Sequence, residues 1–268
     1  MGIKEELDKF YTKESIAKEL IKNIEIDIYD CVIEPSAGNG SFSSQINHEN
    51  LIALDLKPES NNIIQKDWFD YKIDPNYKNV LIIGNPPFGQ RNNLSKSFIR
   101  HAISFENVFT IAFILPNVYN KHTNQKVFPS NWKLMKIIPI EKNGFILNGK
   151  EYHVPCSFYI WTKNYNGIDL RYDENKYKTN DFIFISPKEK ENSDFFVMGA
   201  SPKIIKDTTE VENTNRGYYI KSMIDLDLLK FRFKNINWSQ HGNSSANGGV
   251  SWYSKTELIK VYEENKLI

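Results

Sequence analysis

The sequence predicts a doubly wound α/β fold with a mostly parallel sheet, an antiparallel edge strand and a small α+β region towards the C-terminus. Short apolar runs alternate with helix-like or polar segments up to about residue 165. Several of these runs are almost continuously apolar, which is typical of strands that helices cover on both faces. After Lys163 the pattern changes to polar segments and short aromatic runs. We therefore place a domain boundary near residue 165, between regions 1–165 and 166–268.

Each predicted element follows from the hydrophobic period and from the residues that bound it. The first helix covers 14–24, where Ile16, Leu20 and Ile21 share one face, and Thr12 is its expected N-cap. A second helix covers 94–105. The last two predicted strands should pair antiparallel and close one edge of the sheet. In chain order the predicted strands are 29–35, 51–56, 62–68, 79–87, 109–116, 134–140 and 156–162.

The composition describes a globular chain but leaves its function open. With 40% hydrophobic residues the chain can bury a core, and no stretch approaches the roughly 20 apolar residues needed to span a bilayer. The two cysteines, Cys31 and Cys156, lie in apolar runs and fit buried thiols in a reducing compartment. The formal charge of +1 hides an uneven distribution. Residues 1–100 carry 12 basic and 15 acidic side chains, whereas residues 101–150 carry six and two.

A glycine-containing loop, EPSAGNGSF, follows the first predicted strand. Gly38 and Gly40 permit a tight turn with close backbone approach, and a following helix would present N–H groups to a ligand. A dinucleotide-binding loop would place a third glycine where Ser43 stands, which counts against that class of cofactor. Glu34, at the end of the strand, suits a cationic amino acid better than a pyrophosphate.

Two acidic residues follow the next two strands. Asp55 lies 17 residues after Gly38, where a carboxylate can accept both hydroxyls of a ribose. Asp67 could accept from the exocyclic amine of an adenine ring, with Trp68 or Phe69 offering an apolar face. A surface aspartate at a strand end and an Asp-Trp turn packed on the core are the structural alternatives.

The most specific motif, Asn85-Pro86-Pro87-Phe88, follows the fourth predicted strand. Two prolines stiffen the backbone and remove two N–H donors, which leaves carbonyl groups facing a cleft. The Asn85 side-chain oxygen and the Pro86 carbonyl could then both accept from one planar amino group, while Phe88 stacks on the ring that carries it. The carboxyl edge of a parallel sheet is where such folds bind ligands, so the motif favours a functional site.

These motifs together resemble those of S-adenosylmethionine-dependent N6-adenine methyltransferases with an Asn-Pro-Pro-Phe/Tyr motif, in the gamma order, over roughly residues 9–163. The resemblance implies a Rossmann-like methyltransferase sheet and S-adenosylmethionine as cofactor. It implies that the methionine moiety lies under Phe10, Tyr11 and Thr12, with Glu34 near its amino group. The cofactor-binding residues would also include Ser36, Ala37, Gly38 and Gly40 in the loop, Asp55 and Leu56 at the ribose, and Asp67 and Trp68 at the adenine.

The same resemblance implies a target site. Asn85, Pro86 and Phe88, with Pro87 completing the motif, would hold the target base, and Phe145 or its rival Tyr152 would stack on the other face of that base. Lys121 and Lys126, in the basic stretch, would contact phosphates beside the cleft. The short region 166–268 could serve target recognition.

We therefore expect methyl transfer to adenine N6 in DNA, with the base flipped out of the helix. RNA, a protein glutamine amide and an inactive methyltransferase-like binding subunit remain the alternatives, in that order. No metal is expected, because the five histidines lack ligand spacing. The expected location is intracellular, as a solitary or phage-type enzyme, with no membrane partner and the oligomeric state left open.

Overall fold

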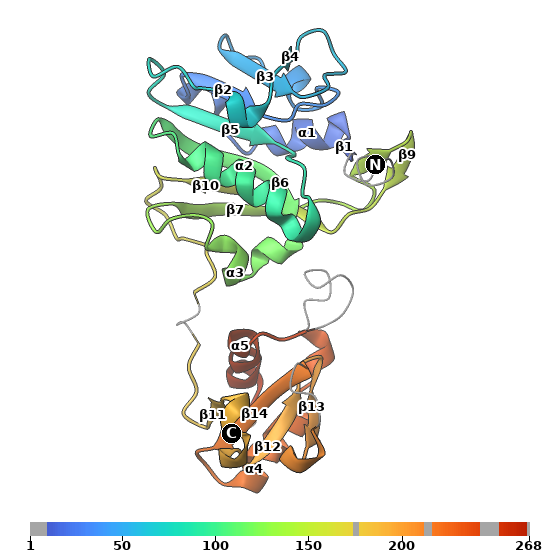
Figure 1. Ribbon diagram of the computed structural model, residues 1–268, viewed down its shortest axis with the longest axis vertical. Helices are drawn as coiled ribbons and strands as arrows, with labels where there is room; N and C mark the ends of the chain where they lie inside the picture. Colours follow the sequence, from blue (N-terminus) through green and yellow to red (C-terminus); the bar gives the residue numbers. More distant parts are fainter. Residues whose placement is uncertain (1–9, 174–176, 212–215, 242–251, 267–268) are drawn as a thin grey trace. The chain divides into compact units, whose positions relative to one another are not determined.

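The computed structural model describes residues 10–173, 177–211, 216–241 and 252–266 (Figure 1). The chain divides into two compact units, Met1–Tyr172 and Asp173–Ile268. The boundary therefore falls a few residues beyond the expected residue 165, because the polar stretch after Lys163 still bonds to the first unit. Leu134 N donates to Asp169 Oδ1 at 2.9 Å, and Leu170 N donates to Leu134 O at 2.9 Å.

The first unit is built on a seven-stranded sheet in the order β4-β3-β2-β5-β6-β10-β7. The five strands from β4 to β6 are parallel, and β10 is antiparallel to both of its neighbours. The expected antiparallel pair at one edge is confirmed, but the antiparallel strand itself lies second from the edge, because β10 inserts between β6 and β7. The bounds are β2 Cys31–Glu34, β3 Leu51–Asp55, β4 Ile64–Gln65, β5 Val80–Gly84, β6 Val108–Pro116, β7 Lys133–Pro139 and β10 Cys156–Thr162.

Helices cover both faces of this sheet (Figure 1). Successive strand residues point to opposite faces, so neighbours such as Val32 and Ile33 belong to different cores. Helix α1 (Glu14–Ile21) packs Ala17 and Leu20 into the core that contains Val32. Helix α2 (Asn93–Ile103) packs Phe98, Ile99 and Ala102 into the core that contains Ile33. This arrangement confirms the doubly wound α/β fold.

Three local predictions differ from the structure. Helix α1 ends at Ile21 rather than at residue 24, and its N-cap is Lys13 because Thr12 belongs to the strand β1 (Tyr11–Thr12). The glycine loop leads into a single 3₁₀ turn, Ser43–Gln45, instead of a helix. The strand expected at 62–68 is reduced to β4, because Trp68 turns into a 3₁₀ segment, Trp68–Asp70, and packs in the core.

A small three-stranded sheet, in the order β1-β8-β9, adjoins the carboxyl edge of the main sheet. Strands β8 (Phe145–Leu147) and β9 (Lys150–Tyr152) form a hairpin in which Asn148 and Gly149 have φ of 50° and 73°. Two positive φ angles are typical of a type I′ turn. The short β1 joins this hairpin by pairing Thr12 with Phe145. A short helix, α3 (His122–Gln125), follows β6.

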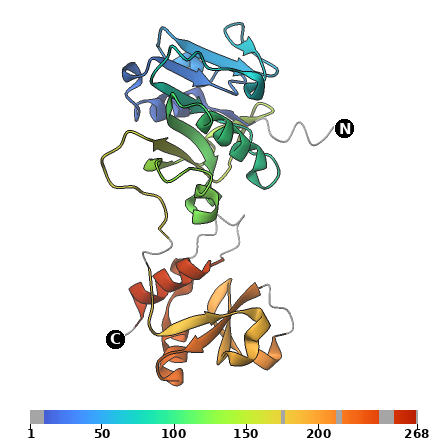
Figure 2. The same cartoon turned by 60° about the vertical axis from the view of Figure 1, so that its left-hand side comes forward.

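The second unit is α+β, as predicted (Figures 1 and 2). Its antiparallel sheet has the order β11-β14-β12-β13. Helices α4 (Leu226–Asn235) and α5 (Lys255–Asn265) share one core with the sheet, in which Phe233 and Tyr262 pack against Phe182. The strands are β11 Phe182–Ile185, β12 Phe195–Met198, β13 Ser201–Lys206 and β14 Gly217–Ser222. Within the described residues, no helix has both the length and the apolar character needed to cross a membrane.

Candidate active site

A cavity of about 500 Å³ lies at the carboxyl ends of β2, β3 and β5. Parallel α/β sheets bind ligands at this edge because the connections leave a crevice there. The cavity brings together residues that the sequence places in six separate segments. From the expected site it includes Phe10, Tyr11, Thr12, Glu34, Ser36, Ala37, Gly38, Asp55, Leu56, Asp67, Trp68, Asn85, Pro86, Pro87 and Phe88.

The glycine loop contacts both β1, through Tyr11, and the end of β3, through Asp55. Gly38 has a φ of +57°, and a Cβ atom there would lie 2.9 Å from Cε1 of the Tyr11 ring. The Tyr11 hydroxyl in turn donates to the Glu59 carboxylate, so the tyrosine side chain packs over the loop and is held at its far end. Gly40 has a φ of +86° and lies outside the cavity lining, where its N–H donates to Ala37 O at 2.7 Å. Gly40 therefore shapes the turn behind the cavity wall.

Glu34 is a buried acid at the cavity wall, with 2% of its surface exposed. Burial raises the pKa of its carboxyl to about 8, although the hydrogen bonds from Ser43 oppose that shift. The Ser43 N–H, which a longer helix would have offered to a ligand, donates to Glu34 Oε2 at 2.9 Å. Gly84 leaves room for this side chain, since a Cβ there would lie 3.2 Å from Glu34 Cγ. A positively charged ligand group would favour the ionised carboxylate.

Asp55 is held by two backbone donors. Gly38 N donates to its Oδ2 at 2.7 Å, and Lys57 N donates to its Oδ1 at 2.8 Å. Each carboxylate oxygen can accept more than one hydrogen bond, so Asp55 keeps acceptor capacity for a diol. The two backbone hydrogen bonds fix the orientation of the Asp55 carboxylate.

The aromatic pair after β4 divides its roles between core and cavity. Trp68 is 1% exposed, and its ring packs edge-on against His101 with centroids 4.8 Å apart. Phe69 is 37% exposed and also lines the cavity. Asp67 caps the 3₁₀ segment by accepting from Phe69 N at 2.9 Å. Phe69 therefore offers the larger accessible aromatic surface to a ligand, whereas Trp68 supports the wall from behind.

The Asn85 amide is fixed at one end and unsatisfied at the other. Its Nδ2 donates to the backbone carbonyl of Phe10 at 3.1 Å. Its Oδ1 is buried and, among the residues that the structure describes, finds no hydrogen-bond partner. The hydroxyl of Thr12, which also lines the cavity, is buried and unpartnered within the same described residues. Buried polar atoms without partners are costly, so both atoms are candidate ligand contacts.

The aromatics expected on the second face of the target base, Phe145 and Tyr152, and the lysines expected at its phosphates, Lys121 and Lys126, lie outside the cavity lining. Phe145 is fully buried in the core with α1, whereas Tyr152 is 45% exposed and stacks on Phe10 with ring centroids 5.1 Å apart. Lys121 precedes α3 and Lys126 follows it, in the segment that leaves the carboxyl end of β6. Since β6 neighbours β5 in parallel, both lysines lie along the edge of the sheet that carries the Asn85 motif.

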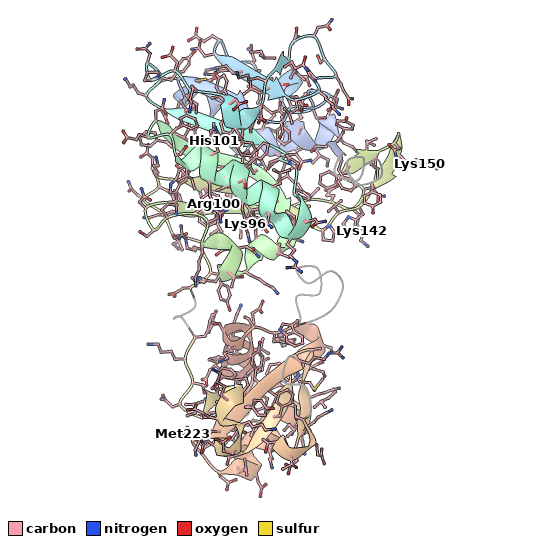
Figure 3. All side chains as sticks on the ribbon, viewed as in Figure 1. Lys96, Arg100, His101, Lys142, Lys150 and Met223 are labelled. Atoms are coloured by element: carbon pink, nitrogen blue, oxygen red, sulfur yellow. The ribbon has the colours of Figure 1, made fainter. Side chains whose placement is uncertain are left out.

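The cavity also contains residues that sequence reasoning did not single out. Lys57 follows Asp55 by two residues, and Lys66 directly precedes Asp67. Their position next to acidic residues at strand ends is the sequence signal that could have identified them. Basic side chains also lie on the adjoining elements: Lys96 and Arg100 on α2, Lys150 at the start of β9 and Lys142 just before β8 (Figure 3). The remaining additions are Pro35, Asn39, Ser41, Phe42, Leu94 and Phe98; Phe69, which the sequence offered as the alternative to Trp68, also lines the cavity.

Metal ligation has no support in the described part of the chain, where no three His, Cys, Asp or Glu side chains gather into a cluster. Cys31 and Cys156 are both buried and unbridged.

No protein-family model matches the sequence, and no curated protein is significantly similar to it. Among solved structures, the 23S rRNA methyltransferase ErmE has 10% identity and a TM-score of 0.44, covering 57% of this chain and 69% of its own. A presumptive RNA methyltransferase from Pyrococcus horikoshii has 16% identity and a TM-score of 0.41, covering 58% and 83%. A predicted N6-adenine-specific DNA methylase from Listeria monocytogenes has 12% identity and a TM-score of 0.35, covering 55% and 50%. At these scores the function of the chain has to be inferred from its own cavity.

Proposed function

We propose that this chain is an S-adenosylmethionine-dependent methyltransferase that methylates the N6 amino group of adenine in nucleic acid, with DNA as the first substrate to test. The observation that carries the proposal is Asn85 Oδ1, a buried acceptor with no partner among the described residues, beside Pro86 and Phe88 in the cavity. An acceptor of this kind, next to an aromatic ring, suits a planar ring that carries an amino group.

The donor set of the cavity fits S-adenosylmethionine. Glu34 is a buried acid available to the cationic amino group, and the unpartnered Thr12 hydroxyl is available to the carboxylate. Asp55 would accept the ribose hydroxyls, and Asp67 with the exposed face of Phe69 would hold the adenine. Leu56, which is 62% exposed, would be covered by the same adenine ring. When bound, the cofactor supplies an electrophilic methyl group on its sulfonium.

Asn85 would act on the target amine rather than on the cofactor. The N6 lone pair of adenine is delocalised into the ring, which makes that nitrogen a poor nucleophile. Hydrogen bonds from both N–H protons, one to Asn85 Oδ1 and one to the Pro86 carbonyl, would favour a pyramidal nitrogen with its lone pair directed at the methyl group. Phe88 would stack on the base. The catalytic contribution would come from positioning and preorganised dipoles, without a strong general base.

A duplex substrate would need to release its adenine from the base stack, at a cost of about a few kcal/mol that aromatic stacking offsets in part. Basic side chains on α2, on the segment after β6 and around the β8–β9 hairpin would bind phosphates. Phe145 is buried in the core and is therefore not proposed to stack on the target base. The second unit, Asp173–Ile268, is proposed to contribute to target recognition.

The proposal is tested by incubating the full chain with isotopically labelled S-adenosylmethionine and, separately, DNA, RNA and protein. Nucleoside and residue mass spectrometry then identifies the labelled product. We expect N6-methyldeoxyadenosine; N6-methyladenosine would move the substrate to RNA, and methylglutamine would move it to protein. Asn85→Ala should abolish the label while binding the cofactor nearly as well as the native chain. Full turnover in that variant would rule out the role proposed for Asn85.

A further inference from the structure

The amide of Asn85 has one orientation in this structure, and a backbone group far away in the sequence sets it. Nδ2 donates to Phe10 O at 3.1 Å across 75 positions of sequence. The opposite orientation would face Oδ1 against the Phe10 carbonyl oxygen, two acceptors without a proton between them. The Phe10 carbonyl therefore decides that the oxygen of Asn85, and not its nitrogen, is the group left for a ligand.

The Phe10 ring is also in contact with Tyr152. Phe10 precedes β1, which forms two residue pairs with β8, and Lys13 N, just after β1, donates to Gly144 O at 3.1 Å. Beyond that pairing, the Phe10 ring stacks on Tyr152 at 5.1 Å between centroids and 22° between planes. Tyr152 lies on β9 directly opposite Phe145, which is buried in the core. The stack thus connects the start of β1 to an anchored hairpin.

We propose that Tyr152 is a positioning residue for Asn85, acting through the ring and the carbonyl of Phe10. The inference rests on the proposed role of Asn85 and extends it to a residue outside the cavity lining. Without the Tyr152 ring, the Phe10 carbonyl loses one of the contacts that fix its position, and the amide can rotate. The acceptor then no longer points at the substrate amine in most molecules, although the cavity itself is intact.

The first test replaces Tyr152 by Phe and by Ala. Tyr152→Phe keeps the stack and should keep turnover within about twofold. Tyr152→Ala should lower kcat by roughly 10- to 100-fold, because a misplacement of about 1 Å can cost up to about 100-fold. The Kd of Tyr152→Ala for S-adenosylmethionine should change much less than kcat. Because Tyr152 is 45% exposed, thermal unfolding should be affected no more than by Ile28→Ala, a 53% exposed side chain before β2.

A direct base-stacking role for Tyr152 gives a different result. In an Asn85→Ala background, Tyr152→Ala should leave the Kd for a fluorescent adenine-containing oligonucleotide unchanged if Tyr152 acts through Asn85. A severalfold weaker Kd in that background would show that Tyr152 touches the substrate, and would overturn the inference. Native turnover in Tyr152→Ala would overturn it as well.

The second test is Asn85→Asp, assayed against pH. At neutral pH a carboxylate oxygen would face the Phe10 carbonyl, so turnover should fall at least tenfold although a carboxylate is the stronger acceptor. On acidification the substituted carboxyl can donate to Phe10 O, so its turnover relative to the native chain should rise. Other titratable or charged groups lining the cavity are Tyr11, Glu34, Asp55, Lys57, Lys66 and Asp67, and the native chain carries them all.

These variants separate this inference from the proposed function. If the native chain labels no DNA, RNA or protein, the methyltransferase proposal fails. If the native chain is active and Asn85→Asp is equally active at neutral pH, the Phe10 carbonyl does not orient the amide and only this inference fails. The expected result is an active native chain, an active Tyr152→Phe, a slow Tyr152→Ala and an Asn85→Asp variant that recovers at low pH.

Discussion

The backbone N–H of Gly38 donates to Asp55 Oδ2 at 2.7 Å and thereby joins the glycine loop to the end of β3. Lys57 N holds the other carboxylate oxygen at 2.8 Å. One aspartate thus organises the loop and, in the proposed function, binds the ribose.

Asp55→Ala should weaken S-adenosylmethionine binding by about 10- to 100-fold, because hydrogen bonds to charged groups contribute about 1.5–3 kcal/mol. Asp55→Asn should lie between Ala and the native chain, since the amide retains one acceptor oxygen. Isothermal titration calorimetry measures both Kd values. Equal affinity in all three proteins would exclude Asp55 from the cofactor site.

Gly38→Ala should lower both stability and cofactor affinity. The new Cβ would stand 2.9 Å from the Tyr11 ring, at a φ of +57° that itself costs about 1–2 kcal/mol for a residue with a side chain. Gly149→Ala is the matched control, because Gly149 has a φ of +73° with no atom within 4 Å of the added Cβ. Chemical denaturation should show a larger loss for Gly38→Ala, and only that variant should lose affinity. Identical behaviour of the two would mean that Tyr11 moves aside without consequence.

Glu34→Gln should be more stable than the native chain at high pH and close to it at low pH. Burial raises the pKa of Glu34 from its ordinary 4.5 to about 8, so ionisation opposes folding. The resulting loss of stability is absent below about pH 4.5, grows as pH rises and is complete above about pH 8. The stability difference should reach a few kcal/mol. Urea unfolding at pH 5 and pH 8.5 measures it, and a difference independent of pH would contradict the assignment.

The same carboxyl gives a ligand-linked prediction. Binding of a cationic amino group beside Glu34 should release a proton near pH 7, because the positive charge stabilises the carboxylate. Calorimetric titrations of S-adenosylmethionine in buffers of different ionisation enthalpy should show that release in the native chain, and Glu34→Gln should abolish it. Unchanged proton release in Glu34→Gln would assign the titrating group elsewhere.

Phe69→Ala and Trp68→Ala should fail in different ways. Phe69 is partly exposed at the cavity, so Phe69→Ala should weaken cofactor binding several-fold and reduce stability only slightly. Trp68 is 1% exposed, so Trp68→Ala should cost about 3–5 kcal/mol of unfolding free energy. Denaturation and cofactor titration of both variants distinguish the roles. A large loss of stability in Phe69→Ala, with unchanged affinity for the cofactor, would show that Phe69 packs in the core and does not bind the cofactor.

Local patterns predicted the main sheet well because its strands are short apolar runs bounded by turn residues. The strand expected at 156–162 is β10, Cys156–Thr162, and the helix expected at 94–105 is α2, Asn93–Ile103. The same patterns failed where one residue type suits two kinds of structure, as Thr12 suits both a helix N-cap and a strand. Thr12 is a good N-cap by type, but its backbone pairs with Phe145, and strand pairing with a distant segment has no local signal.

The sequence by itself determined the α/β class, the order of the elements and the segments that meet at the carboxyl edge, because these depend on hydrophobic period and on glycine, proline and acidic residues at strand ends. Only the tertiary structure decided that β10 enters between β6 and β7, that Phe69 rather than Trp68 presents its ring to the cavity, and that the Asn85 amide is oriented by Phe10. These features depend on contacts between segments far apart in the chain. Local sequence does not distinguish between the alternative strand, ring and hydrogen-bond partners of these residues. Tertiary packing and hydrogen-bond geometry select among them.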